Sequence, residues 1–164
     1  MSDYSLESEA GKLLYERNLK LALAESCTGG LVGHRVTNVP GSSEYFVGGF
    51  AVYSYEAKAS VLGVSWDILN TFGAVSRETV IAMARGARKA LDVDIAVSVS
   101  GIAGPGGGTA DKPVGTVWVG LVTPDGDWSR EFHFEGDREQ NKASSADAAL
   151  QMLLDYLQGN FKLI

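Results

Sequence analysis

The segment that decides the fold is Leu19-Lys20-Leu21-Ala22-Leu23-Ala24-Glu25-Ser26-Cys27-Thr28-Gly29-Gly30-Leu31. Its first half, residues 19–24, is mostly apolar and is typical of a strand that is covered on both faces of a sheet. The apolar pattern breaks at Glu25, and helical spacing resumes over residues 31–36. Residues 26–30 are therefore predicted to connect the end of a strand to the start of a helix.

The rest of the chain extends this unit into an alternating α/β pattern. The turn Pro124-Asp125-Gly126 joins two β-rich runs into a hairpin, so at least one strand is antiparallel to its neighbour. The sequence therefore predicts one domain over residues 1–164, a three-layer α/β/α sandwich with a mixed, mostly parallel sheet of about five strands. We expect helices at 5–20, 31–36, 56–62, 66–71, 76–91 and 138–158, and strands at 19–24, 46–53, 94–100, 114–122 and 128–134.

The composition excludes several classes of protein. A chain of 164 residues with 45% hydrophobic side chains is long and apolar enough to bury a core. No apolar run approaches the roughly 20 residues that span a bilayer. The 14 basic and 20 acidic residues give a net charge of −6, which argues against binding to nucleic acid.

The chain has few residues that could bind a metal ion or form a disulfide. The single cysteine, Cys27, has no partner for an internal disulfide, and only His34 and His133 join it as nitrogen or sulfur ligands. We therefore expect no metal site. No signal peptide is evident, so we expect a cytoplasmic protein.

The loop after the first strand is the most informative candidate site. A hydroxyl group at Ser26 or Thr28 would lie beside the N–H groups of a helix start, which can hold a phosphate or the oxyanion of a reacting carbonyl. The alternative is that these hydroxyl groups simply cap the helix. Cys27 is interpreted as a small buried side chain rather than a nucleophile.

Three other segments supply candidate groups, each with an ordinary alternative. Lys58, five residues after Tyr53, would serve as a general base if burial removes its proton, but lysines are mostly exposed. The glycine-rich residues 100–108 either bind an anion through backbone N–H groups or form a loop without a ligand. Arg138 either pairs with a phosphate or carboxylate or is solvated, and Asp137 before it is a possible helix cap.

Together these segments resemble a known family. Six blocks occur in one order, at residues 24–30, 49–64, 73–76, 100–105, 112–117 and 136–138. Over about residues 6–157 they resemble the carboxy-terminal domain of the CinA (competence/damage-inducible) family, whose members act as nicotinamide-nucleotide amidohydrolases. The resemblance implies an anticodon-binding-domain-like sandwich, no metal or cofactor, and a homodimer. Longer members carry a further amino-terminal domain, so we expect this chain to be a stand-alone form.

The resemblance also implies a reaction, the hydrolysis of nicotinamide mononucleotide (NMN) to nicotinate mononucleotide and ammonia. It implies a serine nucleophile, Ser26, helped by Lys58 and Tyr53. We expect Lys58 to accept the Ser26 proton, directly or through the Tyr53 hydroxyl, because burial favours the neutral form of an amine. N–H groups of residues 28–30 are expected to hold the oxyanion.

The substrate is expected to contact the loops around this serine. The residues predicted to bind it are Thr28, Gly29, Gly30, Ser100, Gly101, Gly104, Arg138 and Lys142. The chain departs from the family pattern at Lys142, where many members have arginine, at Asn141, which replaces an aliphatic residue, and at Tyr55, where a small polar residue is commoner. Lysine lacks the planar fork of arginine, so we expect a phosphate or carboxylate contact at Lys142 to be weaker or differently shaped.

Other functions stay open. The chain could be a non-catalytic nucleotide-binding or regulatory module of the same family, or it could hydrolyse a different amide or ester. Cys27 as the nucleophile is a further hypothesis. The expected partners are a small nucleotide substrate and a second copy of the chain, with the apolar residues 66–72 contributing to the interface, and neither nucleic acid nor membrane.

Overall fold

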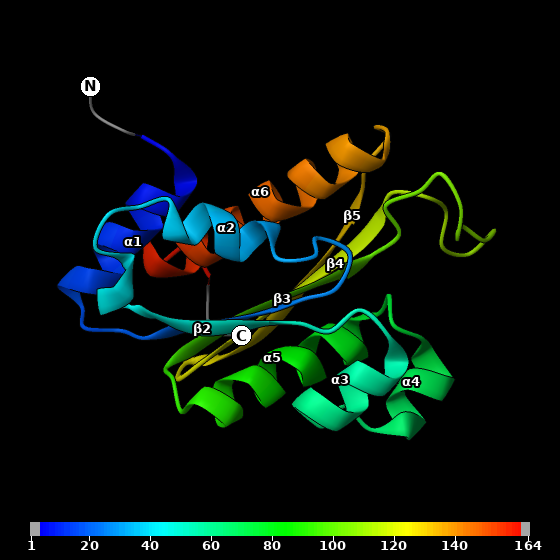
Figure 1. Ribbon diagram of the computed structural model, residues 1–164, viewed down its shortest axis with the longest axis horizontal. Coiled ribbons are helices and arrows are strands. Elements are labelled where there is room, and N and C mark those ends of the chain that lie inside the picture. The colour runs from blue at the N-terminus through cyan, green and yellow to red at the C-terminus, as the bar shows by residue number, and fades with distance from the viewer. Residues whose placement is uncertain (1–3, 162–164) are drawn as a thin grey trace.

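One five-stranded sheet forms the centre of the molecule (Figure 1). The computed structural model describes residues 4–161. The spatial order of the strands is β2-β1-β3-β4-β5. The bounds are β1 Leu21–Glu25, β2 Phe46–Ala51, β3 Ile95–Gly101, β4 Thr116–Thr123 and β5 Gly126–His133.

The sheet is mixed. β1 pairs in parallel with β2 and with β3, whereas β4 pairs antiparallel with β3 and with β5. Four strands therefore run in one direction and β4 runs against them. The predicted hairpin and the mostly parallel sheet are both confirmed.

Helices cover both faces of the sheet (Figure 1). One face carries α1 (Leu6–Glu16), α2 (Leu31–Thr37) and α6 (Arg138–Leu157), and the other carries α3 (Tyr55–Leu62), α4 (Trp66–Phe72) and α5 (Arg77–Leu91). A short 3-10 helix, η1 (Ser42–Glu44), precedes β2. The predicted three-layer sandwich is confirmed.

The side chains of β1 alternate between the two layers because successive residues of a strand point to opposite faces. Leu21 and Leu23 belong to the core on the α1, α2 and α6 side, whereas Ala22 and Ala24 belong to the core under α3 and α5. All four are buried, as the apolar run predicted. Burying apolar surface on both faces is what makes this strand the centre of the fold.

Most predicted boundaries lie within two residues of the observed ones, and the end of the first helix differs by four. The first helix ends at Glu16 instead of residue 20, because Asn18 adopts the left-handed region with φ of 53°, which an α-helix cannot continue. The second strand ends at Ala51 instead of residue 53, because the chain turns there and points two carbonyl groups toward Lys58. Ser65 caps α4 and Ser76 caps α5 with their side-chain hydroxyls, and α3 ends at Gly63, which has positive φ.

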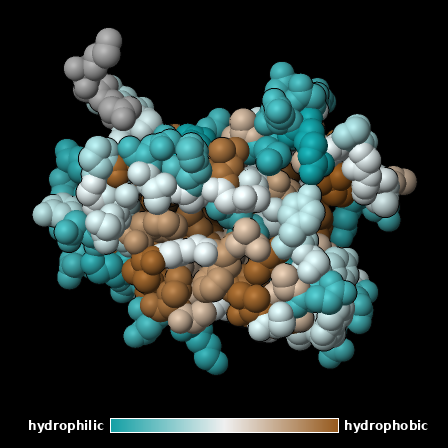
Figure 2. Space-filling model, in the orientation of Figure 1, coloured by the Kyte–Doolittle hydropathy of each residue, from teal (hydrophilic) through white to brown (hydrophobic). Residues whose placement is uncertain are grey.

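Several surface features bear on partners. Figure 2 shows a cluster of apolar residues on the face where β2 forms the edge of the sheet. The side chains of Trp66 and Phe72 are 47% and 43% exposed, so residues 66–72 do offer apolar surface, and the homodimer stays a prediction. Within residues 4–161, no helix has both the length and the apolar character that crossing a bilayer requires.

Candidate active site

The candidate site lies where the parallel strands end. β1, β2 and β3 run in the same direction, so their carboxyl ends meet at one edge of the sheet, the usual place for a site in an open α/β fold. Ser26 directly follows β1, and Lys58 lies on α3, the helix that follows β2. Lys58 Nζ and Ser26 Oγ are 2.9 Å apart, although 32 residues separate them in the sequence.

Lys58 is completely buried, with 0% of its surface exposed. Its Nζ also donates to the backbone carbonyl oxygens of Val52 at 3.0 Å and Tyr53 at 3.1 Å. Burial disfavours the charged amine and lowers the pKa of Lys58 from 10.5 to about 8. The ordinary alternative of an exposed surface lysine is therefore wrong.

The three hydrogen-bond partners of Lys58 Nζ determine how the charged and the neutral amine are oriented. As an ammonium group, Lys58 donates one proton to each carbonyl and one to Ser26 Oγ. As a neutral amine it keeps two protons for the two carbonyls, and its lone pair faces Ser26 Oγ. The neutral form is thus already oriented to accept the proton of Ser26.

Glu25, rather than Ser26 or Thr28, caps the helix that follows the loop. The N-cap of α2 is Gly30, which makes no side-chain capping bond, and the Glu25 carboxylate accepts from the N–H groups of Val32 at 2.9 Å and Gly33 at 3.0 Å. Thr28 Oγ1 donates to the same carboxylate at 2.6 Å. The hypothesis that Ser26 or Thr28 caps this helix is therefore wrong.

Only part of the predicted oxyanion-binding loop is available. The N–H group of Gly29 donates to the carbonyl oxygen of Ser26 at 3.1 Å, so it is already occupied. The N–H groups of Thr28 and Gly30 donate to no acceptor in the part of the chain that the structure describes. Gly29 and Gly30 both have positive φ, 60° and 106°, which a residue with a side chain rarely adopts. These two glycines allow the chain to turn sharply after Ser26.

Ser100 lies beside Ser26. The N–H group of Ser26 donates to the carbonyl oxygen of Val99 at 2.9 Å, which continues the parallel ladder of β1 and β3 by one residue. Ser100 is 1% exposed, and its hydroxyl bonds to no side chain or backbone group among residues 4–161. Trp118 on β4 pairs with Ser100 in the sheet and therefore points to the same face.

Arg138 connects three segments at the mouth of the site. Its guanidinium group donates to the carbonyl oxygen of Gly104 at 2.7 Å and to the Tyr53 hydroxyl at 3.1 Å. The Tyr53 side chain is 64% exposed, so the structure brings the Tyr53 carbonyl, and not its hydroxyl, into contact with Lys58. The direct contact between Lys58 and Ser26 is present, and the relay through the Tyr53 hydroxyl is not. The Asp137 side chain caps α6, which confirms the predicted helix cap.

Asn141 holds the glycine-rich loop against α6. Its side-chain amide donates to the carbonyl oxygen of Ala103 at 3.0 Å and accepts from the N–H group of Gly136 at 3.0 Å. A hollow of about 490 Å³ lies between these segments, and Gly104 and Arg138 are among its lining residues. The start of the glycine-rich loop is therefore anchored to α6, and the binding of an anion by this loop stays a prediction.

Lys142 and Cys27 lie close enough to interact electrostatically, since the positive charge of Lys142 is one of the influences that lower the pKa of the Cys27 thiol. Burial outweighs it and raises that pKa to about 11. The thiol is therefore protonated at neutral pH, which disfavours Cys27 as the nucleophile. Lys142 forms no hydrogen bond or ion pair within the described residues.

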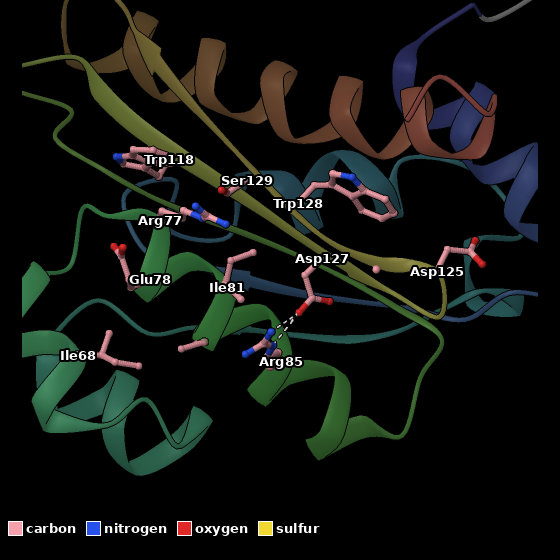
Figure 3. A pocket seen from close by; sticks show the side chains of 12 residues that line it. Ile68, Arg77, Glu78, Ile81, Arg85, Trp118, Asp125, Asp127, Trp128 and Ser129 are labelled. Atoms are coloured by element: carbon pink, nitrogen blue, oxygen red, sulfur yellow. Dashed lines mark hydrogen bonds and ion pairs between the residues drawn. The ribbon is translucent and has the colours of Figure 1, made fainter. Parts of the chain in front are cut away.

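A groove of about 910 Å³ lies between α5 and the β4–β5 hairpin, on the sheet face that α5 covers (Figure 3). Arg85 and Asp127 form an ion pair across it, and Trp118 lies near Arg77 at one end. Neither Ser26 nor Lys58 lines it. Among residues 4–161, no three histidine, cysteine or acidic side chains are grouped closely enough to hold a metal ion.

Three site residues were missed by sequence reasoning. Glu25 had a detectable signal, because a charged residue ends an otherwise apolar strand just before the serine. Asn141 was noted only as a departure from the family pattern, and its amide contacts depend on the tertiary structure. Trp118 had no signal, because only the pairing of β3 with β4 places it beside Ser100.

Comparison with known proteins agrees with this geometry. A model of the CinA C-terminal domain matches residues 3–157. The chain belongs to the CinA family. A CinA-like protein of Chloroherpeton thalassium is 48% identical over 163 residues, which cover 97% of this chain and 39% of that protein. The chain spans less than two fifths of the length of the curated relatives it matches.

Solved structures of CinA-family proteins share the fold. The competence/damage inducible protein CihA from Agrobacterium tumefaciens is 38% identical with a TM-score of 0.88, covering 96% of this chain and 99% of that one. A CinA superfamily protein from Klebsiella pneumoniae is 32% identical with a TM-score of 0.90, covering 94% and 96%. The family resemblance and the fold predicted from the sequence are thus confirmed.

Proposed function

We propose that this CinA-family domain is a nicotinamide-nucleotide amidohydrolase that converts NMN to nicotinate mononucleotide and ammonia. The observation that carries the proposal is the fully buried Lys58 amine, 2.9 Å from the hydroxyl of Ser26. A serine hydroxyl becomes a nucleophile when a nearby base takes its proton, and Lys58 has a lowered pKa and the right orientation to do so. The pyridine nucleotide as substrate rests on the family resemblance.

In the first half of the proposed reaction, Ser26 Oγ attacks the carboxamide carbon while Lys58 Nζ takes the hydroxyl proton. The carbonyl oxygen becomes an oxyanion, which the free N–H groups of Thr28 and Gly30 are suited to bind. The carbon–nitrogen bond then breaks, and Lys58 gives its proton to the leaving ammonia. An ester between Ser26 and the nicotinoyl group remains.

In the second half, water resolves this ester. Lys58, neutral again, takes a proton from the water molecule as its oxygen attacks the ester carbon. The bond to Ser26 breaks, Lys58 returns the proton to the Ser26 oxygen, and nicotinate mononucleotide leaves as the carboxylate after its acid proton passes to solvent. The same amine therefore serves both halves, and no metal ion is required.

We propose that the phosphate of the nucleotide binds between the glycine-rich loop and α6. Arg138 uses two of its donors on neutral acceptors, Gly104 and Tyr53, and therefore keeps its positive charge unpaired. Lys142 is a second unpaired cation on the same helix, one turn further along. Two such cations suit an anionic substrate in a chain whose net charge is −6.

Ammonia release from a panel of amides tests this function. The panel contains NMN, nicotinamide riboside, nicotinamide and two amides without a pyridine ring. We expect NMN to be preferred, and Ser26→Ala to release no ammonia above background. Ser60→Ala, at an exposed position on α3, serves as the matched control and should match the wild type.

Two results would contradict the proposal. Undiminished turnover by Ser26→Ala would remove the nucleophile assignment. A folded wild-type protein that binds NMN but hydrolyses no member of the panel would instead support the non-catalytic module.

A further inference from the structure

Glu25 is a buried acid with an unusual set of partners. It is 4% exposed, it directly precedes Ser26, and it forms no ion pair with any lysine, arginine or histidine within residues 4–161. Burying a carboxylate without a cation is costly unless hydrogen bonds replace its water. Three donors do so here: Thr28 Oγ1 at 2.6 Å, Val32 N–H at 2.9 Å and Gly33 N–H at 3.0 Å.

We propose that Glu25 is a positioning residue that fixes the conformation of the serine loop, residues 26–30. Its main chain ends β1 at one side of the loop, and its side chain reaches across to Thr28 within the loop and to the first turn of α2 on the far side. The loop is therefore closed at both ends by a single residue. This role rests on the proposed function in one respect, which is that Ser26 is the nucleophile.

The arrangement has a consequence for the oxyanion site. In most helices a Ser, Thr, Asp or Asn at the N-cap occupies the first N–H groups from within the loop. Here Glu25 takes the N–H groups of Val32 and Gly33 from outside, and the N-cap, Gly30, has no side chain. The N–H groups of Thr28 and Gly30 are left free beside Ser26. Glu25 thus replaces a local cap that would otherwise crowd the loop.

Glu25 affects the geometry of the serine loop and not the protonation of the base, Lys58. Residues 21 and 23 of β1 face the α2 side of the sheet, and strand alternation places the Glu25 side chain on that same side, whereas Lys58 lies on the opposite side with α3. The contact between a Glu25 carboxylate oxygen and Gly33 of α2 agrees with this placement. Substitution of Glu25 should therefore leave the pH dependence of the reaction in place.

A carboxylate suits this position better than its closest substitutes. One oxygen accepts from Thr28 and Val32, and the other accepts from Gly33. In Glu25→Gln the amide nitrogen must replace one of these oxygens and would then face an N–H group or a hydroxyl proton. Thr28→Val removes a single donor with almost no change in shape, and Thr28→Ser keeps that donor.

The experiment measures two rates for each variant. The first is ammonia release from NMN, separated into kcat and KM over pH 6.5–9.5. The second is the rate at which a fluorophosphonate modifies Ser26, followed by intact mass, which needs no natural substrate. Glu16→Gln, an exposed glutamate on α1, is the matched control, and circular dichroism verifies folding.

We expect Glu25→Gln to lower kcat and the labelling rate together by roughly 10- to 100-fold, with KM within about twofold and the same pH midpoint. Thr28→Val should lose about tenfold, and Thr28→Ser should restore most of that loss. Folded Glu25→Gln and Thr28→Val proteins that react at the wild-type rate would overturn the proposal. If Glu25→Gln does not fold, the Thr28 pair decides the question.

The labelling rate separates the two proposals. A wild type that hydrolyses none of the amides but whose Ser26 is labelled, with the loss expected in Glu25→Gln, refutes the deamidase and supports the role of Glu25. Absence of Ser26 labelling in the wild type refutes both.

Discussion

Burial of the Lys58 amine makes a quantitative prediction about pH. The pKa of Lys58 is about 8, so roughly one molecule in eleven has the neutral base at pH 7 and about ten in eleven have it at pH 9. If the neutral amine is the active form, kcat/KM should rise roughly tenfold between these values and level off above them. Lys58→Met keeps the bulk and removes the base, so activity should fall by about 10²- to 10⁴-fold at every pH.

The same pKa also makes stability depend on pH. The folded protein releases the Lys58 proton near pH 8, whereas the unfolded chain holds it until about 10.5, so the unfolded state binds more protons between these values. The free energy of unfolding therefore rises with pH through this window. The difference between pKa values of 8 and 10.5 corresponds to about 3 kcal/mol of unfolding free energy.

Lys58→Met isolates this contribution. The substitution also removes hydrogen bonds to Val52 and Tyr53 and changes the packing, but those effects do not depend on pH. The difference in unfolding free energy between wild type and Lys58→Met should therefore shift in favour of the wild type by about 3 kcal/mol from pH 7 to 10.5. Other titrating groups largely cancel because both proteins contain them.

Two assays check the prediction. Ammonia release, or labelling of Ser26 by a fluorophosphonate, gives the pH profile, and urea unfolding at a series of pH values gives the stability difference. A flat activity profile between pH 7 and 9, together with a stability difference that does not change with pH, would show that Lys58 is not a buried base of lowered pKa. The mechanism derived from its contact with Ser26 would then be wrong.

Two other predictions concern the groups around the reacting serine. Arg138→Ala should raise KM for NMN by roughly 10- to 100-fold but change the slow turnover of nicotinamide riboside, which lacks the phosphate, much less; equal losses for both substrates in steady-state assays would refute a phosphate contact. Cys27→Ala should keep near-wild-type activity, because burial holds the thiol protonated, and iodoacetamide should inactivate the wild type slowly at pH 7. Rapid inactivation that the alanine variant escapes would instead make Cys27 the nucleophile.

Local patterns in the sequence explain why much of the fold was predictable. The apolar run of β1 and the Pro124-Asp125-Gly126 turn each act over a few residues, and both lie where they were expected. Boundaries failed where one residue overrode the pattern, as Asn18 does with its positive φ at the end of α1. The six ordered blocks placed the chain in the CinA family, which the comparisons confirm.

The candidate site was predictable as a set of residues but not as a geometry. Ser26, Lys58 and Arg138 were all identified from the sequence, and the structure brings the first two into contact. The role of the Tyr53 side chain was not predictable, because its carbonyl and its hydroxyl point to different partners, Lys58 and Arg138. The path of the backbone places the carbonyl and the side-chain rotamer places the hydroxyl, so the residue type alone does not say which of the two meets Lys58.

The sequence by itself determined the strand, the loop with its two glycines and the helix that follows, because these depend on neighbours within a turn or a strand. The tertiary structure alone decided that Lys58 loses its contact with water and that Glu25 becomes the cap of α2. Both outcomes depend on how the parallel strands pair and on which face each side chain occupies. A one-residue shift of β1 would exchange the faces of Glu25 and Ser26, and the serine would then point away from Lys58.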